Sequence, residues 1–169
     1  MQKKLLPISI FTALLLSSYG TYASSPQWKV EHDKAVIEGA SQWKLDISCQ
    51  NFVTVGLVGK SNIGAFGIVK GPMTFTIDGN AITANASGHH KGAHIGTGGT
   101  PENDNQIYTI IKKLISGAKE VTVTYDTRKT AEDKTDQVLW KATYSLNGAA
   151  SAIKTVIKKC NNVNTHFKF

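Results

Sequence analysis

The chain has 169 residues, and 19 lysines and arginines against 12 acidic residues give it a formal net charge of +7. Arg128 is the only arginine. Base readout and bidentate phosphate recognition favour arginine over lysine, so the charge does not indicate a nucleic-acid-binding protein. Dispersed lysines are better suited to weak attraction toward anionic components of a cell envelope.

The N-terminus has the three parts of a secretory signal. Lys3 and Lys4 precede an apolar run over residues 5–16, and small residues follow at Thr21 and Ala23. The run is shorter than the about 20 residues that span a bilayer, and no later segment is apolar enough to cross one. We therefore expect a signal peptide over residues 1–23 and a single domain over residues 24–169. That domain should be periplasmic or secreted, with no integral membrane segment after signal removal.

Short strands fill the first half of the mature chain. Apolar and polar residues alternate from Trp43 to Cys49, which is typical of a strand with one buried face. A turn leads into a largely apolar strand over residues 52–58, and these two strands would form a hairpin. Asp78-Gly79 tolerates positive φ and joins two further expected strands.

A helix and a strand–helix unit follow in the second half. Pro101 is well placed as a first helical residue behind Thr100 as the cap, and Gly117 is a natural stop for that helix. Near the C-terminus, alternation over residues 138–146 breaks at Asn147-Gly148 and changes to a helical period that ends at a cysteine. The helical stripes are Ile107, Ile110, Ile111 and Leu114, then Ala149, Ile153, Val156, Ile157 and Cys160. Eight strands are expected, over residues 28–30, 35–37, 43–49, 52–58, 73–77, 81–86, 121–125 and 138–146.

The two cysteines predict one covalent cross-link. Cys49 and Cys160 are the only pair, and an even pair in an oxidising compartment usually forms a disulfide. Two buried reduced thiols are the alternative. The sequence therefore predicts a mainly β fold, either an antiparallel β-sandwich or a β-rich α+β domain. It would carry two short helices, the last ending in the disulfide.

Residues 87–100 contain five glycines and three of the five histidines and lack apolar periodicity. We expect a polar loop, which at this length is uncommon in a compact domain unless it is functional or disordered. His89, His90 and His94 could ligate zinc or copper, with His32 or His166 completing the set. The alternative is a solvated glycine-rich loop. The same loop, through His89, His90, Lys91 and His94, is the expected contact for a protein partner.

No catalytic residue is predicted. No serine lies in a Gly-x-Ser-x-Gly elbow, and the cysteines are expected to bond to each other. The acidic residues cluster at turns and helix starts, where structural roles account for them. A small hydrolase with an unrecognised site is an alternative.

Residues 114–119 and 121–125, followed by residues 144–153, resemble the C-terminal half of the invasion-associated locus B-like periplasmic proteins. In that family a helix ending at glycine leads to a strand and a long hairpin, and a Leu-x-Gly turn then opens a short alanine-rich helix. The resemblance covers about the last third of the mature chain. This chain lacks the family's extra cysteines and closes its helix with Cys160. The resemblance implies a secreted β-rich domain linked to the envelope or to host interaction, and it supplies no catalytic residues.

These observations predict a non-enzymatic binding module for a protein partner at the bacterial envelope or a host surface. Such a module could serve virulence or inhibit an enzyme. A metal-binding protein and a small hydrolase are the alternatives. No cofactor is expected unless the histidines bind zinc or copper.

Overall fold

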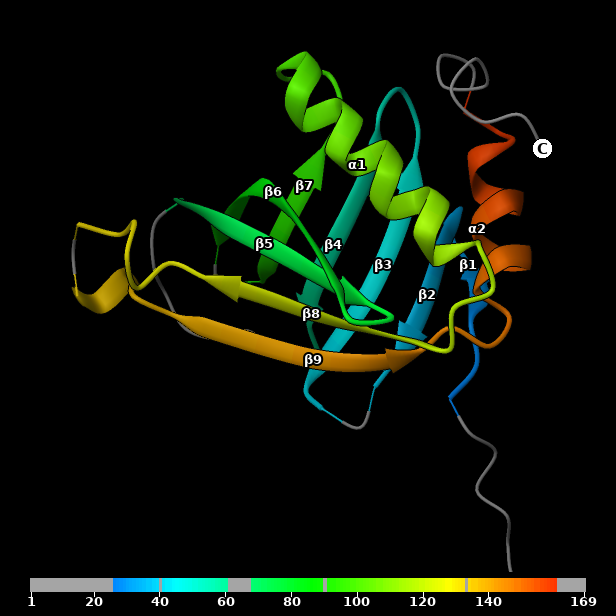
Figure 1. The fold of residues 1–169 in the computed structure, drawn as a ribbon, viewed down its shortest axis with the longest axis horizontal. Coiled ribbons are helices and arrows are strands. Elements are labelled where there is room, and N and C mark those ends of the chain that lie inside the picture. The colour runs from blue at the N-terminus through cyan, green and yellow to red at the C-terminus, as the bar shows by residue number, and fades with distance from the viewer. Residues whose placement is uncertain (1–25, 40, 61–67, 90, 133, 161–169) are drawn as a thin grey trace, which may run out of the picture.

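The computed structural model describes residues 26–39, 41–60, 68–89, 91–132 and 134–160. The expected signal peptide, His90 and His166 lie outside these ranges. Within them, nine strands form one antiparallel sheet in the order β1-β2-β3-β4-β7-β6-β5-β8-β9 (Figure 1). The strands are β1 (Lys29–Glu31), β2 (Lys34–Glu38), β3 (Trp43–Cys49), β4 (Val53–Gly59), β5 (Val69–Ile77), β6 (Asn80–His89), β7 (Gly92–Gly96), β8 (Glu120–Asp126) and β9 (Leu139–Ser145). The helices are α1 (Pro101–Leu114) and α2 (Ala149–Ile157), with a short 3-10 helix at Lys134–Asp136.

The sheet curls so that its inner faces meet. Figure 1 shows β8 and β9 running across the direction of β2, β3 and β4. At the crossing the rings of Trp43 on β3 and Trp140 on β9 have centroids 4.6 Å apart, and Tyr125 on β8 lies 5.2 Å from Trp140. A single hydrogen-bonded sheet thereby encloses a core in the way that two packed sheets would.

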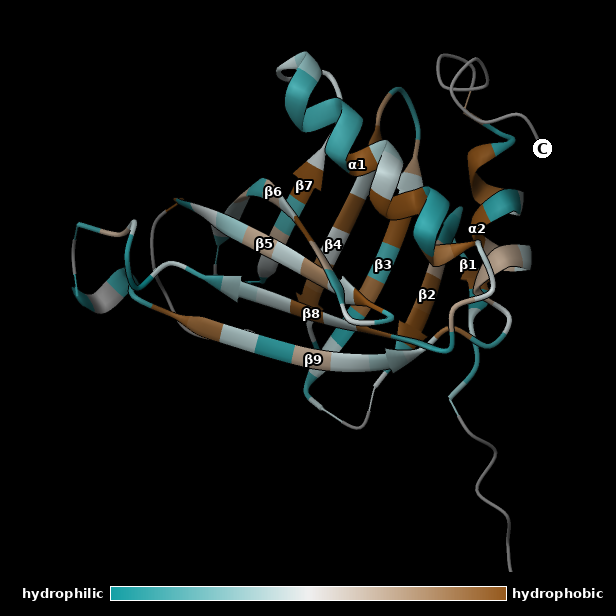
Figure 2. Ribbon diagram, viewed as in Figure 1, coloured by the Kyte–Doolittle hydropathy of each residue, from teal (hydrophilic) through white to brown (hydrophobic). Residues whose placement is uncertain are grey.

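Both helices supply side chains to that core. Figure 2 shows apolar residues along β2, β3 and β4 and along α2. The expected stripe of α1 is fully buried, and Thr100 caps this helix by accepting a hydrogen bond from the backbone N–H of Asn103. Along α2, Ile153 and Ile157 are fully buried, as the helical period predicted. The expected fold class, mainly β and antiparallel with two helices, is confirmed.

The Cys49–Cys160 disulfide is present, with the two Cα atoms 5.4 Å apart. The sequence predicted that the last helix ends at this disulfide, and that detail is wrong. α2 ends at Ile157, and the chain then tightens: the N–H of Lys159 bonds to the carbonyl of Val156, and the N–H of Cys160 bonds to that of Ile157. The cross-link therefore follows the helix by one turn and joins it to the inner face of β3.

Residues 87–100 are not the long polar loop that we expected. β6 continues to His89, and β7 takes up residues 92–96 after a short turn. β7 lies in the middle of the sheet, between β4 and β6. Ala93 and Ile95 alternate inward and are at most 1% exposed. The sequence did not predict this ninth strand because its other positions are glycine or histidine, which have low preference for β-strands.

Glycine also has a packing role here. A Cβ atom at Gly88 would lie 2.7 Å from Cζ of Tyr125, so the ring occupies the space that a side chain would need. The hydroxyl of that tyrosine donates to the carbonyl of Val69 at 2.7 Å. A glycine that looks like a loop residue in the sequence is therefore a strand residue beside a buried aromatic ring.

Candidate functional site

The described histidines of the β6–β7 hairpin lie on the outer face of the sheet. In β7 the inward residues are Ala93 and Ile95, so His94 between them points to the opposite face. In β3 the inward residues are Leu45 and Ile47, so Asp46 points outward as well. Both helices pack on the inner, core side, and the outer face of these strands is where polar groups gather.

Gly56 on β4 brings two of those groups together. It pairs with Asp46 on one side and with His94 on the other. A Cβ atom at Gly56 would lie 2.6 Å from Cδ2 and 2.9 Å from Nε2 of His94, and it would also collide with Oδ1 of Asp46. The carboxylate of Asp46 on β3 and the imidazole of His94 on β7 therefore both occupy the space above Gly56. Each lies in the electrostatic field of the other.

The carboxylate of Asp46 is held by an ion pair. Its Oδ2 accepts from Nζ of Lys34 on β2 at 2.8 Å. The Asp46 side chain is only 10% exposed, whereas that of Lys34 is 47% exposed. A carboxylate buried to this degree needs a charged partner, and Lys34 provides it from the next strand.

His89 extends the group toward the hairpin end. Its ring stacks on that of His94, with centroids 5.3 Å apart and an interplanar angle of 16°. Nδ1 of His89 accepts from the backbone N–H of Lys91 at 3.2 Å, and the Lys91 side chain is exposed in the turn. We call Lys34, Asp46, His89 and His94 the histidine patch.

The pKa of His94 lies below its usual value of 6.5, chiefly because burial disfavours the charged imidazolium. Asp46 opposes this lowering, while His89 and Lys34 add to it. His94 is therefore more readily neutral than a histidine in water, and its charge is set by groups on three other strands.

This lowered pKa predicts a pH-dependent stability. As pH falls through about 6.5, an unfolded chain protonates this histidine before the folded protein does, so stability falls with acidification. The loss continues until the folded pKa is passed. We expect the melting temperature to fall less in His94→Gln than in the native protein between about pH 8 and about pH 5. Thermal unfolding followed by circular dichroism measures this, and equal losses in both proteins would contradict it.

Metal binding finds limited support in this arrangement. The residues that the structure describes contain no group of three or more His, Cys, Asp and Glu side chains placed to hold a metal ion. His89 and His94 lie together but face to face, and His90 is outside the described residues. The zinc or copper site remains a prediction from the sequence.

The residue types of a nucleophilic triad also occur along this row. Ser87 on β6 pairs with His94, which faces Asp46 across Gly56. Within the described part of the chain, no hydrogen bond joins Ser87 to His94 or His94 to Asp46, whereas activation of serine requires both. We derive no catalytic step from this row.

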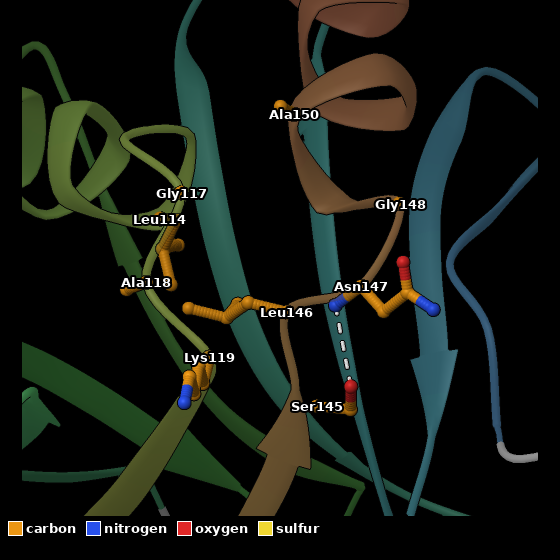
Figure 3. A pocket seen from close by; sticks show the side chains of 9 residues that line it. All are labelled: Leu114, Gly117, Ala118, Lys119, Ser145, Leu146, Asn147, Gly148 and Ala150. Carbon is orange, nitrogen blue, oxygen red and sulfur yellow. Dashed lines mark hydrogen bonds between the residues drawn. The ribbon is translucent and has the colours of Figure 1, made fainter.

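A separate hollow of about 500 Å³ lies where α1 ends, β8 begins and β9 turns into α2 (Figure 3). Leu114 and Leu146 form its apolar wall, and its polar side chains, Lys119, Ser145 and Asn147, are all at least partly exposed. Gly148, with φ of +80°, begins α2 without a side-chain cap. An exposed lysine near an open helix start does not define a ligand, so we assign none to this hollow.

Sequence reasoning found the histidines but not their partners. Lys34, Asp46 and Gly56 lie on three strands, and only the register of the sheet brings them beside His94. The alternation of β3 did predict that Asp46 faces outward. Which outward residues become neighbours depends on pairing over long sequence distances, which one sequence does not supply.

Comparison of the chain with protein-family models, curated proteins and solved structures finds no match. The resemblance to invasion-associated locus B-like proteins therefore stays a prediction. Among the described residues, neither helix has the length and apolar character needed to cross a bilayer.

Proposed function

We propose that this protein is a non-enzymatic binding module that contacts a protein partner through the histidine patch and the adjoining turn at Lys91. The observation that carries the proposal is the packing of Asp46 and His94 over Gly56 on the outer face of the sheet. Side chains fixed in this way lose little conformational freedom on binding, which favours their use in recognition.

The charges of this region suit an acidic partner surface. The charges of Lys34 and Asp46 balance each other in their ion pair, and the exposed Lys91 brings a positive charge to the hairpin end. Protonation of His94 would add a further positive charge, so affinity for an acidic surface should rise as pH falls. The formal net charge of +7 stays positive after Lys3 and Lys4 are removed with the expected signal peptide, so it favours the same class of partner.

The cellular location belongs to the proposal as well. The Cys49–Cys160 disulfide is of the kind that persists in oxidising compartments. Together with the expected signal peptide it supports action in the periplasm or after secretion, on a partner at the bacterial envelope or a host surface. Roles in virulence or enzyme inhibition are versions of this binding function.

Charge reversal at the hairpin end tests the proposal. We expect Lys91→Glu to weaken partner binding by roughly tenfold, equivalent to about 1.4 kcal/mol, because it opposes an acidic surface without touching the core. Immobilised native protein would capture partners from envelope extract and culture medium for identification by mass spectrometry. Calorimetry with the purified partner would then compare the variants.

Lys112→Glu is the matched control, because it makes the same charge change on an exposed position of α1, away from the outer face. It should bind like the native protein. Equal affinity of the Lys91→Glu and native proteins for every captured partner would reject the hairpin end at Lys91 as part of the contact.

A metal titration distinguishes the proposed binding module from the metal-binding alternative. Calorimetric titration with zinc and copper should show no binding that depends on His89 and His94 if the patch serves a protein partner. Tight binding that is lost in the double variant His89→Ala/His94→Ala would favour the metal-binding function instead.

A further inference from the structure

One edge of the sheet is open along most of β9. β9 ends the strand order and pairs only with β8 among the described strands. Val138 and Leu146, which flank β9, hydrogen-bond toward β8: the carbonyl of Val138 accepts from the N–H of Thr127, and the N–H of Leu146 donates to the carbonyl of Lys119. The backbone N–H and C=O groups of the even-numbered residues in this segment therefore point toward β8.

The N–H and C=O groups of the odd-numbered residues point away from β8, toward the edge of the sheet, because these groups alternate in direction along a strand. The structure bears this out at Ser145, whose carbonyl accepts from the indole Nε1 of Trp28 at 2.9 Å. That indole takes the place of a strand partner at one end of the edge. For Leu139, Lys141 and Thr143, no partner of the edge-facing backbone groups is found in the described part of the chain.

The two edges of the sheet are protected to different degrees. β1, at the opposite edge, has three residues, and the side chains of Lys29 and Glu31 form an ion pair 2.7 Å long. Short length and charge are the usual means by which an edge resists pairing. β9 has seven residues, a single charged one, Lys141, and an exposed Leu139. It is the edge that is suited to receiving another strand.

A second copy of this chain is a poor occupant. Symmetric antiparallel pairing over residues 139–143 would place Lys141 opposite Lys141, and like charges directly opposite destabilise a strand pair. Two neighbouring symmetric registers remain. The one with Lys141 opposite Thr143 requires Ser145, whose carbonyl is already bonded to Trp28. The one with Lys141 opposite Leu139 requires Gln137, whose N–H is already bonded to the carbonyl of Lys134. The charge at the centre of the edge calls for a carboxylate.

We propose that the free edge of β9, from Leu139 to Thr143, binds an extended segment of a partner protein as an added strand. The segment would carry an acidic side chain opposite Lys141 and an apolar side chain opposite Leu139. Backbone hydrogen bonds would supply affinity and the alternate side chains would supply specificity. This surface is separate from the histidine patch, so the two proposals can fail independently.

The test uses the synthetic peptide Thr-Val-Thr-Glu-Thr-Val-Thr, in which valine and glutamate share one face when extended. We expect it to bind the native protein more tightly than the peptide with lysine in place of glutamate, by roughly fivefold. A third peptide, N-methylated at the valine and glutamate amides that would face β9, should not bind. On binding of the first peptide, the amides of Leu139, Lys141 and Thr143 should exchange more slowly, while that of Ala142 should not change.

Lys141→Glu is the decisive variant, because its side chain is exposed and its backbone does not face β8. It should retain the native melting temperature and reverse the preference, so that the lysine peptide binds better than the glutamate peptide. Failure of every peptide to bind, equal binding of the N-methylated peptide, or an unreversed preference in Lys141→Glu would each overturn the proposal.

Discussion

Ile153→Asp should largely unfold the protein. Ile153 is fully buried on the core side of α2, where the helix packs against β1, β2 and β3. An unpaired carboxylate there costs several kcal/mol, against a total stability of about 5–15 kcal/mol for a domain of ordinary size. Urea unfolding followed by tryptophan fluorescence would measure the loss, since Trp28 and Trp43 lie in the same core.

Ser151→Asp is the matched control for this substitution. It introduces the same side chain in the same helix, but at an exposed position in the first turn, where a negative charge interacts favourably with the helix dipole. We expect a change below about 0.5 kcal/mol. If the two variants unfolded at the same urea concentration, the orientation of α2 described above would be wrong.

Removal of the disulfide should produce the second largest effect. The cross-link joins residues 111 positions apart, and in the chain-entropy model a loop of that size contributes roughly 4–5 kcal/mol. Cys49→Ala/Cys160→Ala replaces two buried, apolar half-cystines by small apolar side chains, so most of the effect should come from the lost cross-link. The free energy of unfolding in urea should fall by about this amount.

Native protein unfolded in the presence of a reductant provides the comparison. Its unfolding midpoint should approach that of the double alanine variant, because both lack the constraint on the unfolded chain. A double variant whose midpoint equals that of the oxidised native protein would show that the bond contributes nothing measurable.

Local periodicity predicted the helices well. The stripe of α1 and its cap at Thr100, and the stripe of α2 from Ala149 to Ile157, occupy the positions that the sequence indicated. These patterns depend on residues three and four apart, so one segment contains all the information needed. Lys158, Lys159 and Cys160 depart from the helix because their conformation depends on reaching β3, which the local pattern does not contain.

β7 was missed for the opposite reason. Its inward pair, Ala93 and Ile95, is short, and its remaining residues are two glycines and a histidine. Such a segment has low intrinsic strand preference and is held in place by β4 and β6 on either side. Tertiary context therefore decided its conformation. The histidine patch could not be assembled from the sequence for the same reason, since Gly56 acquires its meaning only between Asp46 and His94.

The disulfide has a topological consequence. Because it joins the last residue of β3 to the chain beyond α2, the backbone from Cys49 to Cys160 is a covalent ring. β1, β2 and β3 up to Cys49 form a branch outside that ring. The exposed stretch at Arg128 and Lys129 lies on that ring. A single proteolytic cut there would leave one connected molecule with two new chain ends. A cut between β2 and β3 would instead leave β1 and β2 attached only through sheet hydrogen bonds and packing.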